Sequence, residues 1–162
     1  TGAWATVAPM AKGRFGARAA VLDGKIYVAG GYGGDYLNSM EIYDPGTNIW
    51  AAAAPMPTAR ASFGMAAVGG KIYAAGGYSG GHLRSMEIYD PQSNTWSAVA
   101  PMGTARRMFG LAVMRGKLYA VGGIGNDSAR LATAEAYDPE HDRWEAVAPM
   151  ASARSGHALA AV

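Results

Sequence analysis

The chain has 162 residues, of which 50% are hydrophobic and 16% are charged, and its formal net charge is +2. This composition excludes a disordered chain, and so small a net charge gives no support to nucleic acid as a partner. The chain has no cysteine, which excludes disulfides, thiolate metal sites and a catalytic thiol, and which fits a cytoplasmic protein. No apolar run approaches the ~20 residues that cross a bilayer, so we expect no membrane partner.

From its beginning the chain carries a pattern that occurs four times: a tryptophan, an Ala-Pro-Met triplet, and an arginine five residues after the proline. The tryptophans are Trp4, Trp50, Trp96 and Trp144, and the arginines are Arg14, Arg60, Arg106 and Arg154. A pattern at a near-constant spacing indicates units that bury their apolar faces against one another. We therefore expect an array of similar modules.

Two apolar runs joined by a short turn follow each of the first three arginines. The first runs span 17–22, 63–68 and 109–114, and each ends at a glycine-containing turn before a lysine. The second runs end in glycine pairs, at 30–31, 76–77 and 122–123. This order predicts β-hairpins whose glycines permit close backbone packing, and it argues against a phosphate-binding loop because no helix follows the glycines.

A third and a fourth strand complete the unit. The stretch S-M-E-I-Y-D-P at 39–45 recurs at 85–91 and, as T-A-E-A-Y-D-P, at 133–139, and its apolar residues alternate with period two. Asp-Pro ends this strand, and a further strand begins just before each of the later tryptophans. A single four-stranded sheet leaves apolar faces exposed, so such sheets must pack face to face around an axis, as the blades of a β-propeller do.

The glycine pairs, the tyrosine and tryptophan seven residues apart, and the Ala-Pro-Met triplet with its arginine closely resemble the kelch repeat. Tyr43 and Trp50 are the first such pair. The sequence is most similar to the kelch domains of BTB-kelch ubiquitin-ligase adaptors, and the resemblance covers essentially all 162 residues. It implies a protein-binding propeller, the substrate-recognition part of such an adaptor, with no enzymatic activity and no cofactor.

The repeats predict an all-β propeller segment made of four-stranded antiparallel blades. We expect three complete blades, from repeats at about 11–54, 57–100 and 103–148, and a flanking strand at each end, in partial blades at 1–10 and 149–162. Propellers close with roughly four to eight blades, so this segment is not expected to close alone. We expect the remaining blades to come from the same longer chain, in preference to a second copy of a half-ring, and a designed repeat remains open.

Antiparallel strands place the loops between fourth and first strands on the same face as the loops between second and third strands. This face should be basic, because it carries Lys12, Arg14, Arg60, Arg84, Arg106, Arg107, Arg130 and Arg154 against Asp35 and Asp127. Arginines offer planar, bidentate donors to carboxylates and phosphates. The kelch resemblance implies that such a face holds short partner peptides, which are often acidic.

By position in the repeat, the candidate partner-binding residues fall into two groups. The four repeated arginines, Arg14, Arg60, Arg106 and Arg154, lie in the fourth-to-first loops, and Tyr32, Tyr36, Tyr78, Ser79 and His82 lie in the second-to-third loops. Residues that do not repeat are the better candidates for specificity; they are Arg84, Arg107, Arg130, Tyr36, His82 and Asn126. The repeated arginines serve equally well as structural residues, because a residue that occurs once in each blade can stabilise the blade.

Other repeated residues are expected to be structural. Glu41, Glu87 and Glu135 share one place in the third strand, whereas acid–base catalysis needs two carboxylates in unlike environments. The repeated tyrosines, tryptophans and methionines should fill the space between blades, with Met108 as a further candidate contact for a partner. The histidines occupy different repeat positions and predict no metal site.

Three hypotheses about function remain. A protein-interaction module is favoured. The alternatives are an architectural or designed scaffold without a ligand, suggested by the likeness of the first two repeats, and a sugar-modifying enzyme on the kelch fold. Such an enzyme would carry unique polar residues on one blade, directed at the axis, and none of the three repeats differs that much from the others.

Overall fold

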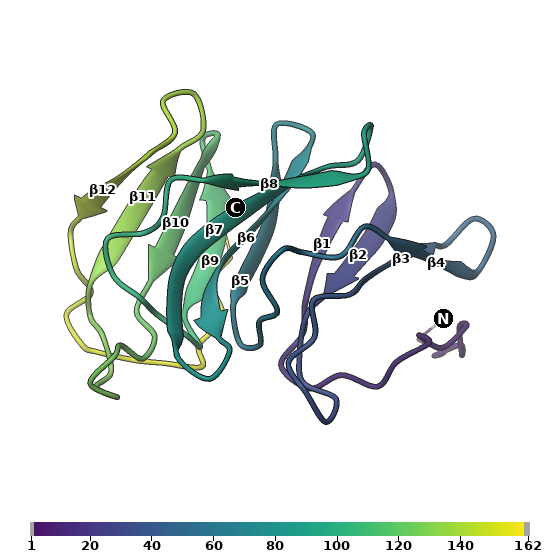
Figure 1. The fold of residues 1–162 in the computed structure, drawn as a ribbon, viewed down its shortest axis with the longest axis horizontal. Coiled ribbons are helices and arrows are strands. Elements are labelled where there is room, and N and C mark those ends of the chain that lie inside the picture. Colours follow the sequence, from purple (N-terminus) through teal and green to yellow (C-terminus); the bar gives the residue numbers. More distant parts are fainter. Residues whose placement is uncertain (1, 161–162) are drawn as a thin grey trace.

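The computed structural model describes residues 2–160, and none of these residues lies in a helix (Figure 1). Twelve strands form three separate sheets of four antiparallel strands, in which sequence neighbours are hydrogen-bonded neighbours. These sheets are the three complete blades that the repeats predict. The predicted fold class is therefore confirmed for the complete blades.

The strands of each blade have the following bounds. Blade 1 holds β1 (Arg18–Leu22), β2 (Lys25–Ala29), β3 (Met40–Asp44) and β4 (Ile49–Ala53). Blade 2 holds β5 (Gly64–Val68), β6 (Lys71–Tyr78), β7 (His82–Asp90) and β8 (Thr95–Val99). Blade 3 holds β9 (Gly110–Met114), β10 (Lys117–Val121), β11 (Ala134–Asp138) and β12 (Arg143–Val147).

The three blades stand side by side, with their first strands innermost (Figure 1). β1 contacts β5 and β5 contacts β9, whereas the fourth strands of successive blades make no such contact. Two apolar cores fill the seams between blades. The core of the first seam, between blades 1 and 2, includes Met40, Met56 and Phe63, and the core of the second seam, between blades 2 and 3, includes Met102 and Phe109.

Repeated polar contacts fix each blade to the chain that precedes it. The indole Nε1 of Trp50 donates to the carbonyl of Ala8 at 2.7 Å, and the hydroxyl of Tyr43 donates to Asn48, whose Oδ1 also accepts the backbone N–H of Ala8. The same three contacts recur at Trp96, Tyr89, Asn94 and Ala54, and at Trp144, Tyr137, Asp142 and Ala100. The prediction that the repeated aromatic residues are structural is confirmed for these three tyrosine–tryptophan pairs, but not for Trp4, which is fully exposed.

The flanking strands predicted at the two ends are absent from the described residues. The chain before Arg18 forms no strand, although the stretch from Ala8 onward docks on blade 1, and Trp4 is fully exposed. Residues 157–160 likewise form no strand, and residues 161–162 of the predicted strand lie outside the described part. A strand requires a neighbour to complete its hydrogen bonds, and within residues 2–160 neither stretch has one.

The first glycine of each pair leaves no room for a side chain. Gly76 has a φ of 60°, and a Cβ atom there would lie 2.6 Å from the carbonyl oxygen of Arg106 in the next blade. Gly30 and Gly122 stand in the same relation to Arg60 and Arg154. The prediction that the glycine pairs permit close backbone approach is confirmed.

Replacing Gly76 by alanine should therefore destabilise the chain by about 2–4 kcal/mol, through left-handed backbone strain and a collision across the seam. Gly80 is the matched control, since its φ of 77° is also left-handed but nothing lies within 4 Å of a Cβ there. Gly80→Ala should lower stability by only about 1 kcal/mol. Urea unfolding of both variants measures the difference, and equal losses would contradict the steric explanation.

Candidate functional site

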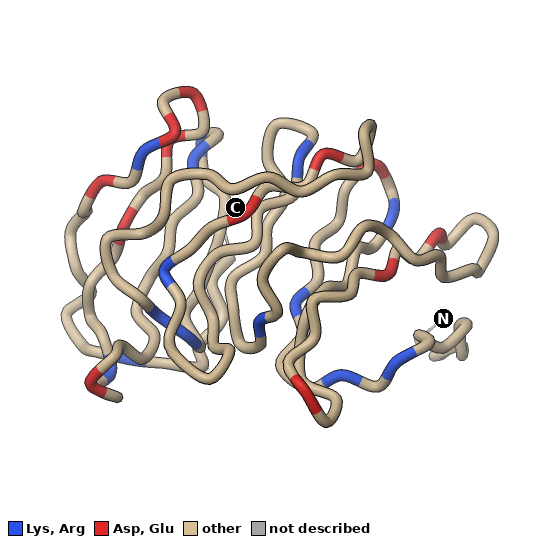
Figure 2. Tube along the Cα trace, viewed as in Figure 1, with Lys and Arg blue, Asp and Glu red and all other residues tan. Residues whose placement is uncertain are grey.

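Two faces of the blade array carry its loops. The loop face holds the fourth-to-first loops at 54–63 and 100–109 and the second-to-third loops at 30–39, 79–81 and 122–133; the turn face holds the remaining connections. Figure 2 shows acidic and basic residues mixed along the turn face, at the top of the view, whereas basic residues predominate along the loop face below. The loop face is the side on which the sequence places the candidate binding residues.

Three of the four repeated arginines on the loop face are buried inside the blades. Arg60 donates to the carbonyls of Gly76 and Ser85, at 2.7 and 3.1 Å, and to the Ser85 hydroxyl at 3.2 Å. It also forms an ion pair with Glu87 at 3.0 Å, and its side chain is 0% exposed. Arg14 and Arg106 form the same set of contacts, each with an ion pair at 2.6 Å, to Glu41 and Glu135 respectively.

This geometry corrects the expectation that the repeated arginines line a partner-binding mouth. The guanidinium groups of Arg14, Arg60 and Arg106 are used within the blades and are not presented to a partner. The prediction that the repeated glutamates stabilise the blades is confirmed by the same contacts. Arg154, by contrast, has an exposed side chain.

A small aromatic pocket opens on the loop face at the first seam. Its volume is about 240 Å³, and it is lined by Phe15, Tyr32, Tyr36, Ala61, Ser62, Tyr78 and Arg107. Tyr36 stands between two other rings, with centroids 5.4 Å from Tyr32 and 5.8 Å from Tyr78 in edge-on geometry. Phe15 and Tyr32 remain 79% and 44% exposed, so the pocket presents aromatic surface to solvent.

Arg107 of blade 3 closes one side of this pocket. Its guanidinium carbon lies 5.0 Å from the centroid of the Tyr78 ring, a cation–π contact, and its Nε donates to Nε2 of His82 at 3.1 Å. Nε2 of His82 must therefore be an acceptor, which places the imidazole proton on Nδ1. Burial, and after it the positive charge of Arg107, lowers the pKa of His82, while Asp127 acts in the opposite direction.

Backbone hydrogen bonds link the loop that carries Ser62 of the pocket to the neighbouring loops, from blade to blade. The N–H of Ser62 donates to the carbonyl of Gly16, the N–H of Met108 to Ser62, and the N–H of Gly156 to Met108, each at 2.8 Å. All four residues have left-handed φ angles between 53° and 69°. Met108 thus has a backbone role in this chain of contacts, and the loops around the pocket hold fixed positions.

The structure brings together five of the predicted site residues, namely Tyr32, Tyr36, Tyr78, His82 and Arg107. Ser79, Arg84, Asn126, Arg130 and Arg154 lie elsewhere on the loop face and do not line the pocket, so their role in binding stays a prediction. Sequence reasoning missed Phe15, Ala61 and Ser62. Phe15 could have been found, because the residue after the repeated arginine differs in every repeat.

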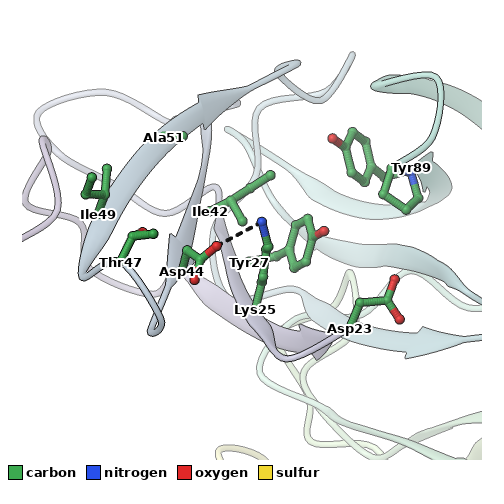
Figure 3. Close-up of a pocket in the computed structure, with 10 residues that line it drawn as sticks. Asp23, Lys25, Tyr27, Ile42, Asp44, Thr47, Ile49, Ala51 and Tyr89 are labelled. Carbon is green, nitrogen blue, oxygen red and sulfur yellow. Dashed lines mark ion pairs between the residues drawn. The ribbon is translucent and has the colours of Figure 1, made fainter.

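The turn face holds two larger pockets whose linings share several repeat-equivalent residues, such as Lys25 and Lys71, Tyr27 and Tyr73, and Pro91 and Pro139. One lies at the first seam, has a volume of about 460 Å³ and contains the ion pair between Lys25 and Asp44 at 3.0 Å (Figure 3). The other lies at the second seam and contains the pair between Lys117 and Asp138, in which the hydrogen bond from Lys117 is the main reason that the pKa of Asp138 falls to about 2. Because repeated residues line both pockets and an ion pair occupies part of each, both are best explained as spaces left by blade packing.

One group on the turn face has the spacing of metal ligands. Oxygen and nitrogen atoms of Asp138, Glu140 and His141 lie within 4.8 Å of one another. Lys117 Nζ donates to Oδ2 of Asp138 at 3.0 Å, and Nδ1 of His141 lies 3.1 Å from the same oxygen, so this carboxylate is already engaged within the protein. The cluster therefore gives no support to a metal site.

The family model described as the KLHDC2/KLHL20/DRC7 Kelch-repeats domain matches residues 3–162. The chain belongs to the kelch-repeat family. Kelch repeats build propellers that bind proteins, and the three blades described above are kelch blades. The pocket at the first seam is accordingly a surface feature of a kelch propeller.

A solved structure described as "Structure of YjhT" matches the kelch blades with a TM-score of 0.85 and 20% identity. The match covers 94% of this chain and 57% of that chain, so this chain spans little more than half the length of its structural neighbour. At that identity the likeness shows the fold alone. No curated protein matches the kelch chain, and no helix among its described residues is long and apolar enough to cross a membrane.

At the position of the repeated arginine, replacing a buried copy should affect the free energy of unfolding far more than replacing the exposed copy. Arg106→Met should lower the free energy of unfolding by about 3–5 kcal/mol, because it leaves Glu135 buried without its cation. Arg154→Met, at the exposed copy, should change it by no more than about 0.5 kcal/mol. Denaturant unfolding tests both variants, and adding Glu135→Gln to Arg106→Met should restore part of the loss.

The contact between Arg107 and His82 predicts the direction of a pKa change. Arg107→Ala should raise the pKa of His82 toward its ordinary value, because a positive charge that disfavours the imidazolium is removed. Nuclear magnetic resonance titration of the histidine Cε1–H signals measures this change, with His82→Gln to assign the signal. Arg115→Ala, on the turn face, is the control and should leave the His82 titration unchanged; a His82 pKa that does not respond to Arg107→Ala would contradict the contact.

Proposed function

We propose that this kelch propeller segment binds a partner protein by inserting a side chain of an extended peptide into the aromatic pocket at the first seam. The single observation that carries the proposal is the cluster of partly exposed rings on fixed loops, closed by Arg107. The pocket volume of about 240 Å³ suits one side chain better than a cofactor or a drug-sized molecule.

The residue types in the pocket support this function. Tyrosine and arginine dominate the binding energy of protein interfaces because they offer large, rigid contact area together with a polar group. The exposed Tyr32 and the partly buried Tyr36 and Tyr78 line the pocket with Arg107, which offers further donors to an acidic or carbonyl group of the peptide. The repeated arginines and glutamates form ion pairs with one another inside the blades, whereas most of the pocket residues do not recur in every blade and are free to contact a partner.

The resemblance to BTB-kelch proteins extends the proposal. The partner would be a substrate delivered to a ubiquitin ligase, the adaptor's other domains would lie outside the sequence, and the protein would act in the cytoplasm. Further kelch blades, from the same longer chain or from a second copy, would complete the ring. The match over 57% of the longer YjhT chain supports the need for more blades.

Neither alternative explains the pocket as well. A scaffold without a ligand does not account for the exposed aromatic side chains of Phe15 and Tyr32. An enzyme that modifies sugars would carry unique polar residues directed at the axis, whereas aromatic side chains form most of the pocket lining. Kelch domains are typically interaction modules, so we assign no enzymatic activity.

A peptide array probed with the purified chain tests the proposal. For the best binding peptide, Tyr78→Ala and Tyr32→Ser should each weaken binding about 10- to 30-fold, which corresponds to roughly 1.5–2 kcal/mol. Fluorescence polarisation with labelled peptide measures the dissociation constants. Circular dichroism melting of the same variants shows whether the fold is kept.

A matched control comes from another exposed apolar side chain. Ile49 is 60% exposed on β4, outside the aromatic pocket. Ile49→Ser should leave peptide binding unchanged. If Ile49→Ser weakens binding as much as Tyr78→Ala, or if the array yields no peptide, the assignment of the pocket is wrong.

A further inference from the structure

Arg18 differs from every other arginine of the blades in its position. It begins β1, the innermost strand of blade 1, where it pairs in register with Ala29 of β2. Ala29 is fully buried in the core of the first seam, and Ala20, two residues after Arg18, belongs to the same core. Because directly opposed residues and residues two apart share one face of a sheet, the Arg18 side chain enters the first seam from the inner side.

The other repeats do not have an arginine at this place. Its counterparts are Gly64, Gly110 and Ala158. A Cβ atom on Gly64 would lie 2.8 Å from Cβ of Leu111, and one on Gly110 would lie 2.9 Å from Cβ of Leu159. The second and third copies are thus too closely packed for a side chain, and blade packing itself does not require Arg18.

The charge of Arg18 has no acidic partner among the described residues. Its Nη1 donates to the carbonyl of the adjacent Ala17 at 3.0 Å, and no carboxylate within residues 2–160 forms an ion pair with it. Burial lowers the pKa of Arg18. For Arg60 the same effect of burial is opposed by the charge of Glu87, and no such opposing charge acts on Arg18.

Arg18 and the aromatic pocket lie on the same seam. Gly16, two residues before Arg18, accepts the backbone hydrogen bond of Ser62 at 2.8 Å, and Ser62 lines the pocket. Two residues of chain span at most about 7 Å, so the Arg18 backbone lies within that distance of Gly16. An extended peptide that fills the pocket therefore has to advance only about two residues toward the axis to reach Arg18.

We propose that Arg18 is a specificity residue that binds a carboxylate of the partner peptide, two or so residues away from the side chain held in the aromatic pocket. A partly desolvated guanidinium without a counter-ion is unfavourable by itself, and a planar carboxylate would satisfy it through two parallel hydrogen bonds. The proposal rests on peptide binding at the pocket. In addition, Arg18 would make binding selective for peptides that carry an acidic group at a fixed distance from the side chain held in the pocket.

A double-mutant cycle between protein and peptide tests this inference. Arg18→Gln should weaken binding of the best array peptide about 10- to 100-fold. The same peptide with its acidic side chain changed to the amide, or with its C-terminus amidated, should bind the wild-type chain weakly and should lose nothing further with Arg18→Gln. Whichever peptide change removes the effect of Arg18→Gln identifies the side chain or the terminus as the source of the carboxylate.

Stability measurements separate a binding role from a structural one. Arg18→Gln, and Arg18→Gly as found at the equivalent places in blades 2 and 3, should melt at or above the wild-type temperature. Arg115→Gln is the control for loss of a positive charge and should not affect binding. Melting temperatures well below wild type for both Arg18 variants would show that Arg18 is structural and would overturn the proposal.

The outcomes also separate this inference from the proposed function. If Tyr78→Ala weakens peptide binding and Arg18→Gln does not, the pocket stands and the role of Arg18 is wrong. If no peptide binds, acetate becomes the probe: titration should shift the Nε–H signal of Arg18 and not that of Arg115. The absence of that selective shift would overturn the anion site at Arg18, whereas the failure of every array peptide to bind would already have overturned the pocket assignment.

Discussion

The buried ion pair between an arginine of the fourth-to-first loop and a glutamate of the third strand organises the whole array. Through its guanidinium, Arg60 binds the second and third strands of its own blade, at Gly76, Ser85 and Glu87. Through its carbonyl, the same residue accepts the N–H of Gly31 from the preceding blade at 2.8 Å. One residue therefore joins two blades, and it does so without exposing its charge.

This arrangement explains why the glycine pairs and the arginines occur together. The arginine carbonyl can reach the preceding blade only where that blade has no side chain, as at Gly30, where a Cβ atom would lie 2.4 Å from it. A buried arginine is tolerated only because its charge is paired and nearly all its donors are used; Nε alone remains without a partner in Arg14, Arg60 and Arg106. The repeated residues are thus committed to packing and leave binding to the others.

Freedom to bind consequently lies at positions where the repeats differ. The residue after the repeated arginine is Phe15, Ala61, Arg107 or Ser155, and the first three of these line a single pocket. The residue four places after it is Arg18, Gly64, Gly110 or Ala158. The first seam thereby differs chemically from the second, although the backbones of the two seams are held by the same contacts.

The sequence by itself determined the strand order, the number of complete blades and the structural role of the repeated tyrosines and later tryptophans, because each of these follows from local alternation, turn residues and spacing. It also determined that Glu41, Glu87 and Glu135 are structural. It left open whether the arginines face a partner or the blade, since the spacing of Arg60 and Glu87 places them in one repeat without fixing the direction of either side chain. The predicted strand at Trp4 failed for a related reason: a strand depends on a neighbour to pair with, which the local pattern does not supply.

Only the tertiary structure decided which non-repeating residues meet. Tyr36, Tyr78 and Arg107 belong to three successive repeats and are far apart in the chain. They meet because the packing of the blades brings their loops together. Arg18 differs in the sequence from its counterparts Gly64, Gly110 and Ala158, but the sequence alone does not show that its side chain enters the seam without a counter-ion. Its significance comes from the absence of a counter-ion within the described residues and from the tight packing at its equivalents, and both are properties of the packed blades.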